Sequence, residues 1–506
     1  MQTGRVKKVI IVGGGTAGWM TAAMVSKQLG KKLDITLVES AAIGTVGVGE
    51  ATIPPIQLFN NVLGLDENEF VKSTQATFKL GIEFQNWGHI GDRYMHTFGT
   101  IGKDVGMIQF YQYWLRASRA GMASDLWDYS FNFQAAMAGK FARLDKIPDS
   151  PLSGITYAFH FDAGLYAKYL SGIAKASGVQ RVEGKITNVN LRSEDGFIQS
   201  VTLENGDTIE GDLFVDCSGF RGLLIEEALE TGYHDWSHWL PVDRAVAVPS
   251  KNVSDEAGSG RPYTQSIAHS AGWQWRIPLQ HRTGNGHVFS SKFMSEDEAT
   301  GILLENLEGE PLAEPRTIPF RTGMRKKFWN KNCVAIGLSS GFLEPLESTS
   351  IHIIQTSITK MMIMFPSSEF NQADIDEYNA QATFDFERIR DFIILHYHAT
   401  KRDDSAFWDH VRTMEIPPEL QQKMDLFKTS GRIFRHRTDL FNEPAWLQVM
   451  YGQGISPEDY HPIADALTDD QLRDYMANIK TIIDTNVVKL PSQSDFIKRF
   501  CAADQA

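Results

Sequence analysis

Six residues near the N-terminus have the spacing of a dinucleotide-binding loop. Gly13-Gly14-Gly15-Thr16-Ala17-Gly18 follows the apolar run 9–12 and precedes a helix-forming segment. In this pattern Gly13 permits a tight turn, Gly15 lets the backbone approach a pyrophosphate, and Gly18 lets helix and strand pack closely. The helix that begins with Thr16 and Ala17 then directs its free N–H groups at the phosphates. The sequence therefore predicts a dinucleotide site here.

An acidic residue stands where the ribose of such a cofactor would lie. Glu39 ends the next apolar segment, 21 residues after Gly18. A carboxylate at this place binds a ribose hydroxyl and disfavours the 2′-phosphate of NADP. No second G-x-G-x-x-G follows a strand elsewhere in the sequence. Either NAD is the only dinucleotide, or FAD is bound and is reduced from outside.

Two charged residues elsewhere have chemically suggestive neighbours. Lys79 lies between Phe78 and Leu80, so we expect a partly desolvated ammonium, which is a strong hydrogen-bond donor. The alternative is a surface lysine whose stem covers a helix. Glu347 precedes a helical run that begins at residue 351. The dipole of that helix favours a negative charge at this place, which would explain Glu347 without any catalytic role. Either Ser348 or Thr349 is expected to cap that helix.

The sequence gives little support for a disulfide framework, a metal site or a serine-hydrolase site. The three cysteines are far apart and form no CxxC pair, which argues against a disulfide framework or a zinc site. His396 and His398 are two residues apart and do not share a helix face, so they are expected to be structural. No G-x-S-x-G elbow of a serine hydrolase occurs. We expect no bound metal.

The elements that position these residues begin with a β-α-β unit. The pattern predicts a strand over 8–12, a helix over 16–29 and a strand over 34–39, and hence a parallel sheet. Further along, the patterns predict a helix from 54–55, a helix over 163–177, short strands over 179–216 with an Asn205-Gly206 hairpin turn, a surface loop over 250–261, and a buried strand over 332–337. From residue 351 onward the chain is expected to be mostly helical.

Composition narrows the class of protein. The 506 residues are 42% hydrophobic, which is an ordinary globular balance. The net charge is 49 − 62 = −13, and because such a surface repels phosphate backbones, no nucleic-acid partner is expected. No stretch reaches eighteen apolar residues, so no membrane span is expected. We expect a soluble protein of the cytoplasm.

Several segments together resemble one known family. They are Gly47–Pro54 (GVGEATIP), Phe214–Gly222 (FVDCSGFRG), Trp273–Pro278 (WQWRIP), Glu344–Thr349 (EPLEST) and the tract His396–Asp404. In this combination the chain resembles the flavin-dependent halogenases of the tryptophan-halogenase family, over about residues 7 to 450. The W-x-W-x-I-P segment is the most specific, because monooxygenases that share the FAD fold lack it.

The resemblance implies a fold of the α/β class. It implies a glutathione-reductase-like, Rossmann-type FAD-binding module with an interleaved β-rich part and a largely helical C-terminal substrate module. On this basis residues 1–365 form the FAD-binding core, with substrate-site segments at about 90–160 and 220–330, and residues 366–506 complete the substrate site. The resemblance also allows a homodimer.

The chemistry implied by the resemblance needs FADH2, O2 and a halide. A partner flavin reductase supplies FADH2, chloride or bromide is converted to hypohalous acid, and that species crosses the protein interior to a separate site for a small aromatic substrate. One alternative is an FAD-dependent monooxygenase or reductase of the same fold, acting on a small aromatic or an isoprenoid. Another is a flavoprotein kept for binding alone, which is expected to have lost Lys79 or Glu347; both are present.

The resemblance also assigns roles to single residues. Lys79 is implied to hydrogen-bond hypohalous acid or form a haloamine, with Glu347 near it to stabilise the cationic ring and accept its proton. The N–H groups of Thr349 and Ser350 are implied to hold the halide; many relatives have glycine in place of Ser350, so a positive φ there would strain serine. The remaining cofactor contacts expected are Gly49, Ala51, Ile186, Leu338 and Ile351.

The implied substrate site is aromatic. His96 and Phe98 resemble a family segment whose rings stack on an indole, and Trp446 is a further candidate. The stretch 434–446 lacks the paired tyrosines that hold the backbone of free tryptophan, although Glu443 and Trp446 are candidates for part of that role. We therefore expect an indole or another electron-rich aromatic rather than free tryptophan. Trp273 and Trp275 are expected on opposite faces of a strand, either separating substrate from flavin or filling the core.

Overall fold

The computed structural model describes all residues except 1–4, 42–48, 255, 367–368, 437 and 505–506. The chain forms two compact units, and each is assembled from three separate stretches. The first unit consists of Met1–Thr74, Phe161–Asp243 and Pro319–Glu387, and the second of Gln75–His160, Arg244–Ile318 and Arg388–Ala506. The domain boundary expected near residue 365 stays a prediction.

A parallel sheet forms the centre of the first unit. Its strands, in order, are β20 (Trp329–Asn330), β21 (Cys333–Ala335), β12 (Leu213–Asp216), β1 (Lys8–Val12), β2 (Asp34–Glu39) and β8 (Gln180–Glu183). All neighbours pair in parallel except β20, which is antiparallel to β21. With α1 (Thr16–Leu29) between β1 and β2, the predicted β-α-β unit is confirmed with the expected bounds.

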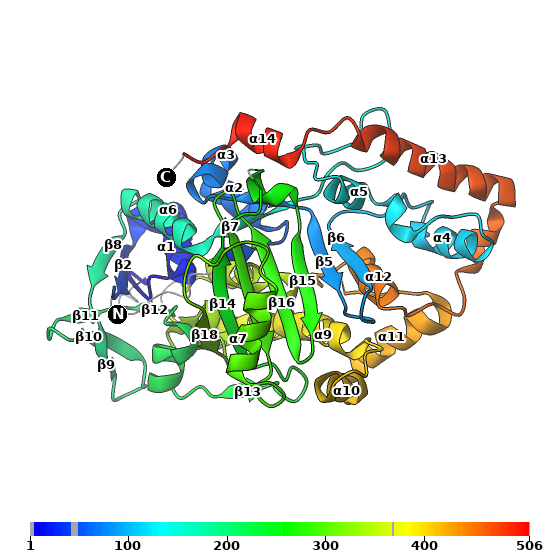
Figure 1. The fold of residues 1–506 in the computed structure, drawn as a ribbon. Coiled ribbons are helices and arrows are strands. Elements are labelled where there is room, and N and C mark those ends of the chain that lie inside the picture. Colours follow the sequence, from blue (N-terminus) through cyan, green and yellow to red (C-terminus); the bar gives the residue numbers. More distant parts are fainter. Residues whose placement is uncertain (1–4, 42–48, 255, 367–368, 437, 505–506) are drawn as a thin grey trace. The chain divides into compact units, whose positions relative to one another are not determined.

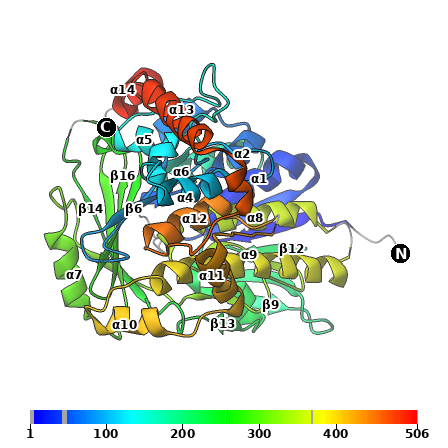
Figure 2. The ribbon, with the colours of Figure 1, turned by 90° about the vertical axis from the view of Figure 1, so that its right-hand side faces the viewer.

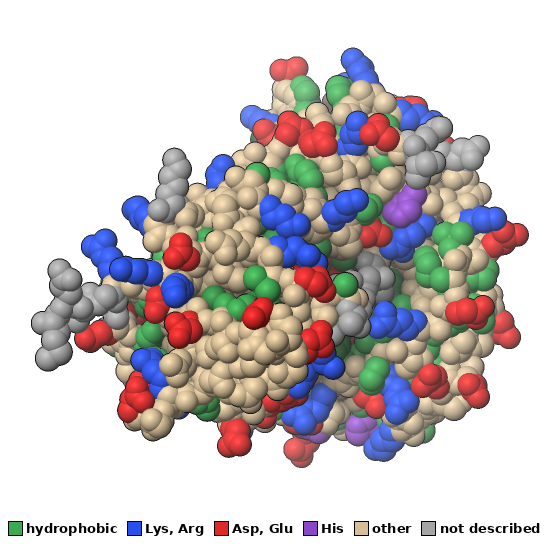
Figure 3. Space-filling model, turned by 90° about the vertical axis from the view of Figure 1, so that its left-hand side faces the viewer, with side chains coloured by type: hydrophobic (Ala, Val, Ile, Leu, Met, Phe, Trp, Pro, Cys, Tyr) green, Lys and Arg blue, Asp and Glu red, His purple; other side chains and the backbone are tan. Residues whose placement is uncertain are grey.

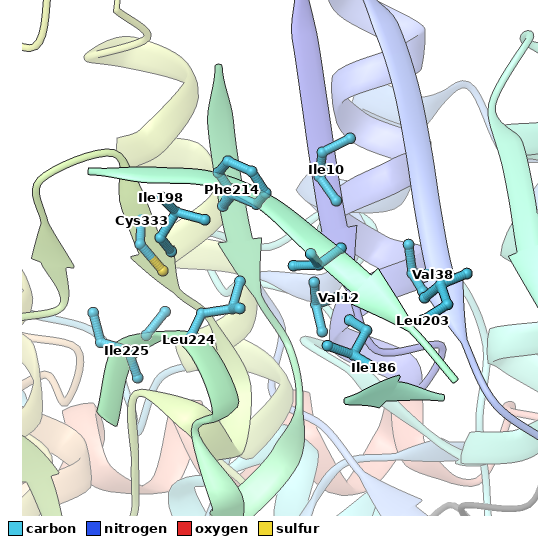
Figure 4. Close-up of a cluster of buried hydrophobic side chains, with 12 residues drawn as sticks. Ile10, Val12, Val38, Ile186, Ile198, Leu203, Phe214, Leu224, Ile225 and Cys333 are labelled. Atoms are coloured by element: carbon cyan, nitrogen blue, oxygen red, sulfur yellow. The ribbon is translucent and has the colours of Figure 1, made fainter. Parts of the chain in front are cut away.

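A second sheet packs its apolar side chains against the strands of the first. It consists of β9 (Ile186–Leu191), β10 (Ile198–Leu203) and β11 (Thr208–Glu210), all antiparallel. The predicted Asn205-Gly206 turn joins β10 to β11, and Gly206 has the positive φ of 88° that the turn requires. Figure 4 shows the shared core, in which Ile186, Ile198 and Leu203 lie with Ile10, Val12 and Phe214.

Helices complete the first unit. They are α2 (Ile56–Leu63), α3 (Glu67–Ser73), α6 (Ala163–Ala176) and α8 (Ser350–Ile363). Helix α1 packs on both α6 and α8. Most of its buried residues are apolar, and the two buried hydroxyls, of Thr21 and Ser26, donate to carbonyl oxygens of the same helix. A small antiparallel sheet of β13 (Tyr233–Asp235), β19 (Gly323–Arg325) and β22 (Gly341–Phe342) belongs to the same unit. These elements match the predicted helices near 54–55 and 163–177.

The second unit is built around a seven-stranded sheet. In order it contains β18 (Arg316–Pro319), β14 (Arg244–Ser250), β17 (Thr283–Phe289), β16 (Gly272–Pro278), β15 (Thr264–His269), β5 (Gly81–Gln85) and β6 (Arg93–Thr97), of which Figure 1 shows β14, β16, β15, β5 and β6 side by side. Strand β14 pairs with β17, β17 with β16, β16 with β15 and β5 with β6, all antiparallel, whereas β5 pairs with β15 in parallel. Beside it, β4 (Thr77–Lys79) pairs with β7 (Ala158–Asp162).

The tryptophan motif lies in β16, and one expectation about it was wrong. Residues two apart in a strand share a face, so Trp273 and Trp275 point the same way. Their ring centroids are 6.2 Å apart, and Trp273 also contacts the Trp87 ring. Trp275 covers Gly286 on β17, where a Cβ would lie 2.0 Å from the indole. Both side chains are buried, which favours the core-packing interpretation within this unit.

The predicted helical character beyond residue 351 is confirmed. After α8 come α9 (Gln372–His398), α10 (Ala406–Thr413), α11 (Pro418–Ser430), α12 (Glu443–Gly452), α13 (Asp469–Val487) and α14 (Gln493–Phe500). In the second unit α13 packs on α4 (Phe110–Arg119) and α5 (Phe131–Met137), and Figure 2 shows these three helices. The aromatic side chains Phe110 and Tyr475 meet there, with centroids 5.8 Å apart.

Charged side chains of both signs are interspersed on the face drawn in Figure 3. Ion pairs such as Arg181–Glu183 and Arg192–Asp195 balance the charge locally in the first unit. Among the helices that the structure describes, none combines the length and apolar character needed to cross a lipid bilayer.

Candidate active site

The loop between β1 and α1 is shaped by its glycines. Gly13 has a φ of +113°, and a Cβ there would lie 2.2 Å from the carbonyl oxygen of Cys217. A Cβ on Gly18 would lie 1.8 Å from the carbonyl oxygen of Gly13. Any side chain at either position would displace backbone, so the tight turn and the close helix–strand contact both depend on glycine.

The N-terminus of α1 opens onto free space. Gly15 is its N-cap, and within the described residues no atom lies within 4 Å of the place that a Cβ on Gly15 would take. Thr16 and Ala17 form the first turn, whose N–H groups have no partner inside the helix. No acidic side chain occupies this turn. An anion such as a pyrophosphate fits this cradle.

Glu39 adjoins the same loop at the end of β2. A Cβ on Gly14 would collide with the Oε2 of Glu39, so the carboxylate lies directly against the glycine loop. The other oxygen, Oε1, accepts a hydrogen bond from Nε of Arg181, and Arg181 also pairs with Glu183. The position suits recognition of a ribose hydroxyl. Sequence reasoning missed Arg181, which comes from the neighbouring strand β8.

A second turn of the first unit lies against the start of α1. Gly337 has a φ of +78°, and a Cβ on it would lie 2.8 Å from the methyl carbon of Ala17. Leu338 follows in the short helix η6 (Gly337–Ser339) and is half-buried. The turn that contains Leu338 therefore starts against the first turn of α1. Contact of Leu338 with the cofactor stays a prediction.

The segment after β12 has a structural role that the sequence did not reveal. Asp216 is fully buried, and its carboxylate accepts hydrogen bonds from the backbone N–H groups of Ser218, Leu224 and Ile225 at 2.8–2.9 Å. Burial, and then the adjacent Asp216, raise the pKa of the Cys217 thiol well above its usual value. A thiol with a raised pKa forms little thiolate, so burial disfavours Cys217 as a nucleophile.

Four further residues that are predicted to contact the cofactor lie far from the glycine loop in the sequence. Gly49 and Ala51 form β3 (Gly49–Ala51), Ile186 begins β9, and Ile351 lies in the first turn of α8. The Ile186 side chain belongs to the core cluster of Figure 4, which leaves its backbone for any contact with a cofactor. Gly47 and Val48 lie outside the described residues. The four contacts stay predictions.

The predicted halide residues form the start of α8. Glu347 ends the short helix η7 (Pro345–Glu347), Thr349 is the N-cap of α8, and Ser350 is its first residue. The Thr349 side chain makes no capping hydrogen bond; its hydroxyl is buried without a hydrogen-bond partner among the described residues. A buried unpaired hydroxyl at a helix N-terminus is a place for an anion or a water.

Ser350 does not need a positive φ, because it already lies within helix α8, so its backbone is unstrained. The left-handed residue is Ser348, with φ 60° and ψ 37°. Serine at 350 therefore offers its N–H at the helix start as readily as glycine would.

Lys79 is fully buried in the second unit. It ends β4 opposite Ala158 of β7, and the small alanine leaves room for the lysine side chain. Its Nζ lies 5.3 Å from the centroid of the Phe98 ring. The predicted desolvation of this ammonium is thus complete, and its partner ring belongs to the predicted substrate segment.

An aromatic cluster surrounds the predicted substrate residues of this unit. The His96 ring lies 5.7 Å from Phe392 and 6.2 Å from Phe441. Phe392 stacks on Phe441 and meets the ring of Trp446 edge-on at 4.9 Å. His96 and Trp446 are therefore joined through two phenylalanines that sequence reasoning missed. Phe392 was visible only as part of an apolar helical run, and Phe441 lies in an irregular segment.

The stretch 434–446 is held by charged pairs in the second unit. Arg435 pairs with Glu443 at 3.0 Å, and Lys423 pairs with Asp439 at 3.4 Å. The Lys423 ammonium also lies 4.6 Å from the centroid of the Trp446 ring. Glu443 is thus already engaged by a cation, which weakens its candidacy for binding an ammonium headgroup.

Lys79 belongs to the second unit and Glu347 to the first. Their predicted meeting at one site therefore stays a prediction. Within the described residues, no cluster of three or more His, Cys, Asp or Glu side chains has the geometry of a metal site.

Comparison with known proteins decides the family. The tryptophan halogenase family model matches residues 8–469. The chain belongs to the tryptophan halogenase family. Two solved flavin-dependent halogenases are 47% identical to it: Xcc4156 from Xanthomonas campestris has a TM-score of 0.96 and covers 99% of this chain and 100% of that one, and BrvH from Brevundimonas sp. BAL3 has a TM-score of 0.94 and covers 98% and 99%.

A curated relative is more distant but equally complete. Tryptophan 6-halogenase SttH from Streptomyces toxytricini is 35% identical over 528 residues, covering 98% of each chain. This tryptophan halogenase family member is therefore a flavin-dependent halogenase with the predicted α/β fold, and it uses FAD and a halide. Halogenases of this kind need an aromatic substrate and a separate source of reduced flavin. The match favours halogenation over the monooxygenase and binding-only alternatives.

The residues present fit the flavin. The glycine loop is open where a pyrophosphate would approach, and Glu39 beside it suits a ribose hydroxyl. FAD, when bound as FADH2, supplies the oxygen chemistry of the family. The protein supplies the loop that holds it, the helix start that suits an anion, and a buried ammonium with aromatic neighbours.

Proposed function

We propose that this halogenase transfers halogen to an indole, or to another electron-rich aromatic without an amino-acid headgroup, with Lys79 and Glu347 as catalytic residues. The observation that carries the proposal is the Lys79 ammonium, fully buried and facing Phe98 in the unit that also holds the aromatic cluster. A desolvated ammonium in a water-poor site donates a strong hydrogen bond, because no solvent competes for it.

The proposed transfer is balanced by two proton movements. Lys79 transfers a proton to the oxygen of hypohalous acid as the oxygen–halogen bond breaks and the ring carbon forms its bond to halogen, and it is reprotonated before the next turnover. The oxygen leaves as water. The ring carbon then loses its proton to the Glu347 carboxylate, which restores aromaticity. Glu347 is buried, so its charge also stabilises the cationic ring before that loss.

We further propose that the start of α8 binds the halide through the N–H groups of Thr349 and Ser350, with the unpaired Thr349 hydroxyl beside it. The isosteric change Thr349→Val should raise the KM for bromide by about 5-fold or more, ~1 kcal/mol, with a smaller effect on kcat. The Tm should not fall, because removing a buried hydroxyl without a partner costs no hydrogen bond. Steady-state kinetics at varied bromide and a thermal melt measure both.

Thr356→Val is the matched control for this prediction. Thr356 lies in the same helix, but its hydroxyl donates to the carbonyl oxygen of Ile353 at 3.1 Å. Its bromide KM should stay at the wild-type value. A Thr349→Val enzyme with unchanged bromide KM would show that this hydroxyl does not face the halide.

The proposed substrate class rests on the residues in and around the stretch 434–446, which lacks the paired tyrosines that hold the backbone of free tryptophan. Lys423, Asp439, Arg435 and Glu443 are engaged with one another or with Trp446, and the aromatic cluster offers flat apolar surfaces. The relatives named simply flavin-dependent halogenases are 47% identical, whereas the tryptophan 6-halogenase is 35% identical. These observations favour a ring without a zwitterionic headgroup.

A substrate panel tests the proposed function. Indole, substituted indoles, phenols and free tryptophan are incubated with the protein, FAD, a flavin reductase, NADH, and bromide or chloride, and products are identified by mass spectrometry. Indole should be halogenated at least about 10-fold faster than free tryptophan, ~1.4 kcal/mol of barrier. Preference for tryptophan contradicts the substrate class, and a hydroxylated product without halogen supports the monooxygenase alternative.

The assembly and location are proposed on the family resemblance. We propose a homodimer that works in the cytoplasm and receives reduced flavin from the reductase by transient contact. Light scattering of the purified protein, with and without the reductase, separates a dimer from a monomer and a transient partner from a stable one.

A further inference from the structure

A histidine that the reaction does not use lies beside Lys79. In the antiparallel pair of β4 and β7, Thr77 stands opposite His160 and Lys79 stands opposite Ala158. Directly opposite residues share a sheet face, and so do residues two apart in one strand. The side chains of Thr77, Lys79, Ala158 and His160 therefore point to one face.

The other face of this strand pair is apolar and fixed. Phe78 stacks on Phe141 at 3.8 Å and contacts Phe159 at 5.7 Å between ring centroids. The backbone N–H of Phe78 donates to Oε1 of Gln493 at 3.0 Å, and the N–H of Leu80 donates to the carbonyl oxygen of Pro262 at 2.7 Å. The strand that carries Lys79 is thus held along its length, and its polar face carries a hydrogen-bond chain through Thr77 and His160.

That chain determines which ring nitrogen of His160 carries the proton. The Thr77 hydroxyl donates its one hydrogen to the carbonyl oxygen of Pro278 at 2.6 Å, because a carbonyl can only accept. Nδ1 of His160 lies 3.0 Å from the same Thr77 oxygen, so Nδ1 must be the donor to it. Nε2 lies 2.9 Å from the Thr264 hydroxyl, which donates to it when the ring is neutral.

The surroundings keep the ring neutral. His160 is fully buried, and burial is the larger cause that lowers its pKa well below the ordinary value. The Lys79 ammonium, on the same sheet face, lowers the pKa further. A neutral ring with hydrogen on Nδ1 therefore links β7, β4 and β15 immediately beside the Lys79 side chain.

We propose that His160 is a positioning residue for Lys79: its Nδ1–H fixes Thr77, and through Thr77 the strand β4, so that the lysine ammonium is held in one place while the ring adds no competing positive charge. This inference rests on the proposed role of Lys79. It assigns His160 no contact with substrate, halide or flavin. The role requires a neutral ring and the donor on the Thr77 side.

Two amide variants separate the hydrogen bond at Nδ1 of His160 from the hydrogen bond at Nε2. In His160→Asn the amide nitrogen falls near the place of Nδ1 and keeps a donor for Thr77. In His160→Gln the amide reaches the place of Nε2 and keeps the link to Thr264 instead. The kcat of His160→Gln should fall by about 10-fold or more, whereas His160→Asn should stay within about 3-fold of wild type. The KM for bromide and for the aromatic substrate should change little in both.

A measurement on the wild-type protein tests the inference without any variant. Protein with 15N-labelled histidine gives distinct ring-nitrogen shifts for the two neutral tautomers and for the imidazolium, and His160→Asn identifies the resonance. At pH 7 the His160 signal should be that of the neutral ring with hydrogen on Nδ1. An imidazolium signal, or hydrogen on Nε2, overturns the inference, even where a variant fails to fold.

The failure of this inference can be told from the failure of the proposed function. If Lys79→Met retains halogenation, the proposed role of Lys79 fails, whatever His160 does. If Lys79→Met is inactive while His160→Gln and His160→Asn have equal kcat, the positioning role fails and the role of Lys79 stands. A selective loss in His160→Gln, with the predicted tautomer, supports the inference.

Discussion

Replacement of Lys79 by methionine should lower the rate of halogenated product formation by more than about 100-fold, equivalent to ~2.7 kcal/mol of barrier. Methionine keeps the length of the apolar stem and removes only the charge. Single-turnover formation of product, followed by chromatography after FADH2, O2 and bromide are mixed with enzyme and indole, measures the loss.

Lys175→Met is the matched control. Lys175 lies 5.4 Å from the ring of Trp19, nearly the distance of Lys79 from Phe98, but it is exposed on α6. Its replacement should leave product formation within about 2-fold of wild type, because an exposed cation–π contact contributes ~0.5–1 kcal/mol to stability and none to the transition state. Product formation by Lys79→Met within a few-fold of wild type would contradict the proposed role. Both variants should bind FAD as the wild type does.

The second large effect is expected at the glycine loop. Gly15→Ala should weaken FAD binding by about 100-fold, ~2.7 kcal/mol, because the added methyl stands where the pyrophosphate approaches the backbone. The change should not disturb the fold, since the surrounding described residues leave that space open and the φ of −76° suits alanine. Titration of apoprotein with FAD, followed by flavin fluorescence, gives the dissociation constant.

Gly172→Ala serves as the control for the added methyl. Gly172 is an exposed residue of α6 with equally open space around it. FAD affinity should be unchanged, and the free energy of unfolding should rise by about 0.5–1 kcal/mol because alanine favours a helix interior over glycine. Wild-type affinity in Gly15→Ala would mean that the pyrophosphate lies elsewhere.

Local patterns explain which parts of the fold were predictable. The β-α-β unit of residues 8–39 was predicted to the residue because an apolar strand, a glycine loop and an apolar helix follow one another without interruption. The Asn205-Gly206 turn was predicted because its backbone angles demand those residue types. The shared face of Trp273 and Trp275 was mispredicted, although the two-residue period of a strand dictates it.

The candidate site was predictable where a single residue carries the signal. The burial of Lys79 follows from its apolar neighbours, and the glycine loop follows from its spacing. Arg181 beside Glu39, Phe441 against Phe392, and the hydroxyl chain around His160 depend on contacts between segments that are distant in the sequence. Such contacts leave no periodic pattern, so only three-dimensional packing reveals them.

The interleaving of the two units bears on how the protein is made. The polypeptide passes from one unit to the other after residues 74, 160, 243, 318 and 387. On the ribosome, the first unit lacks its third stretch until residue 387 has emerged, and the second waits for nearly the whole of translation. No single cut therefore separates two self-sufficient halves, and a chain stopped near residue 390 should aggregate, because the sheet of the second unit would lack the helices α10 to α14.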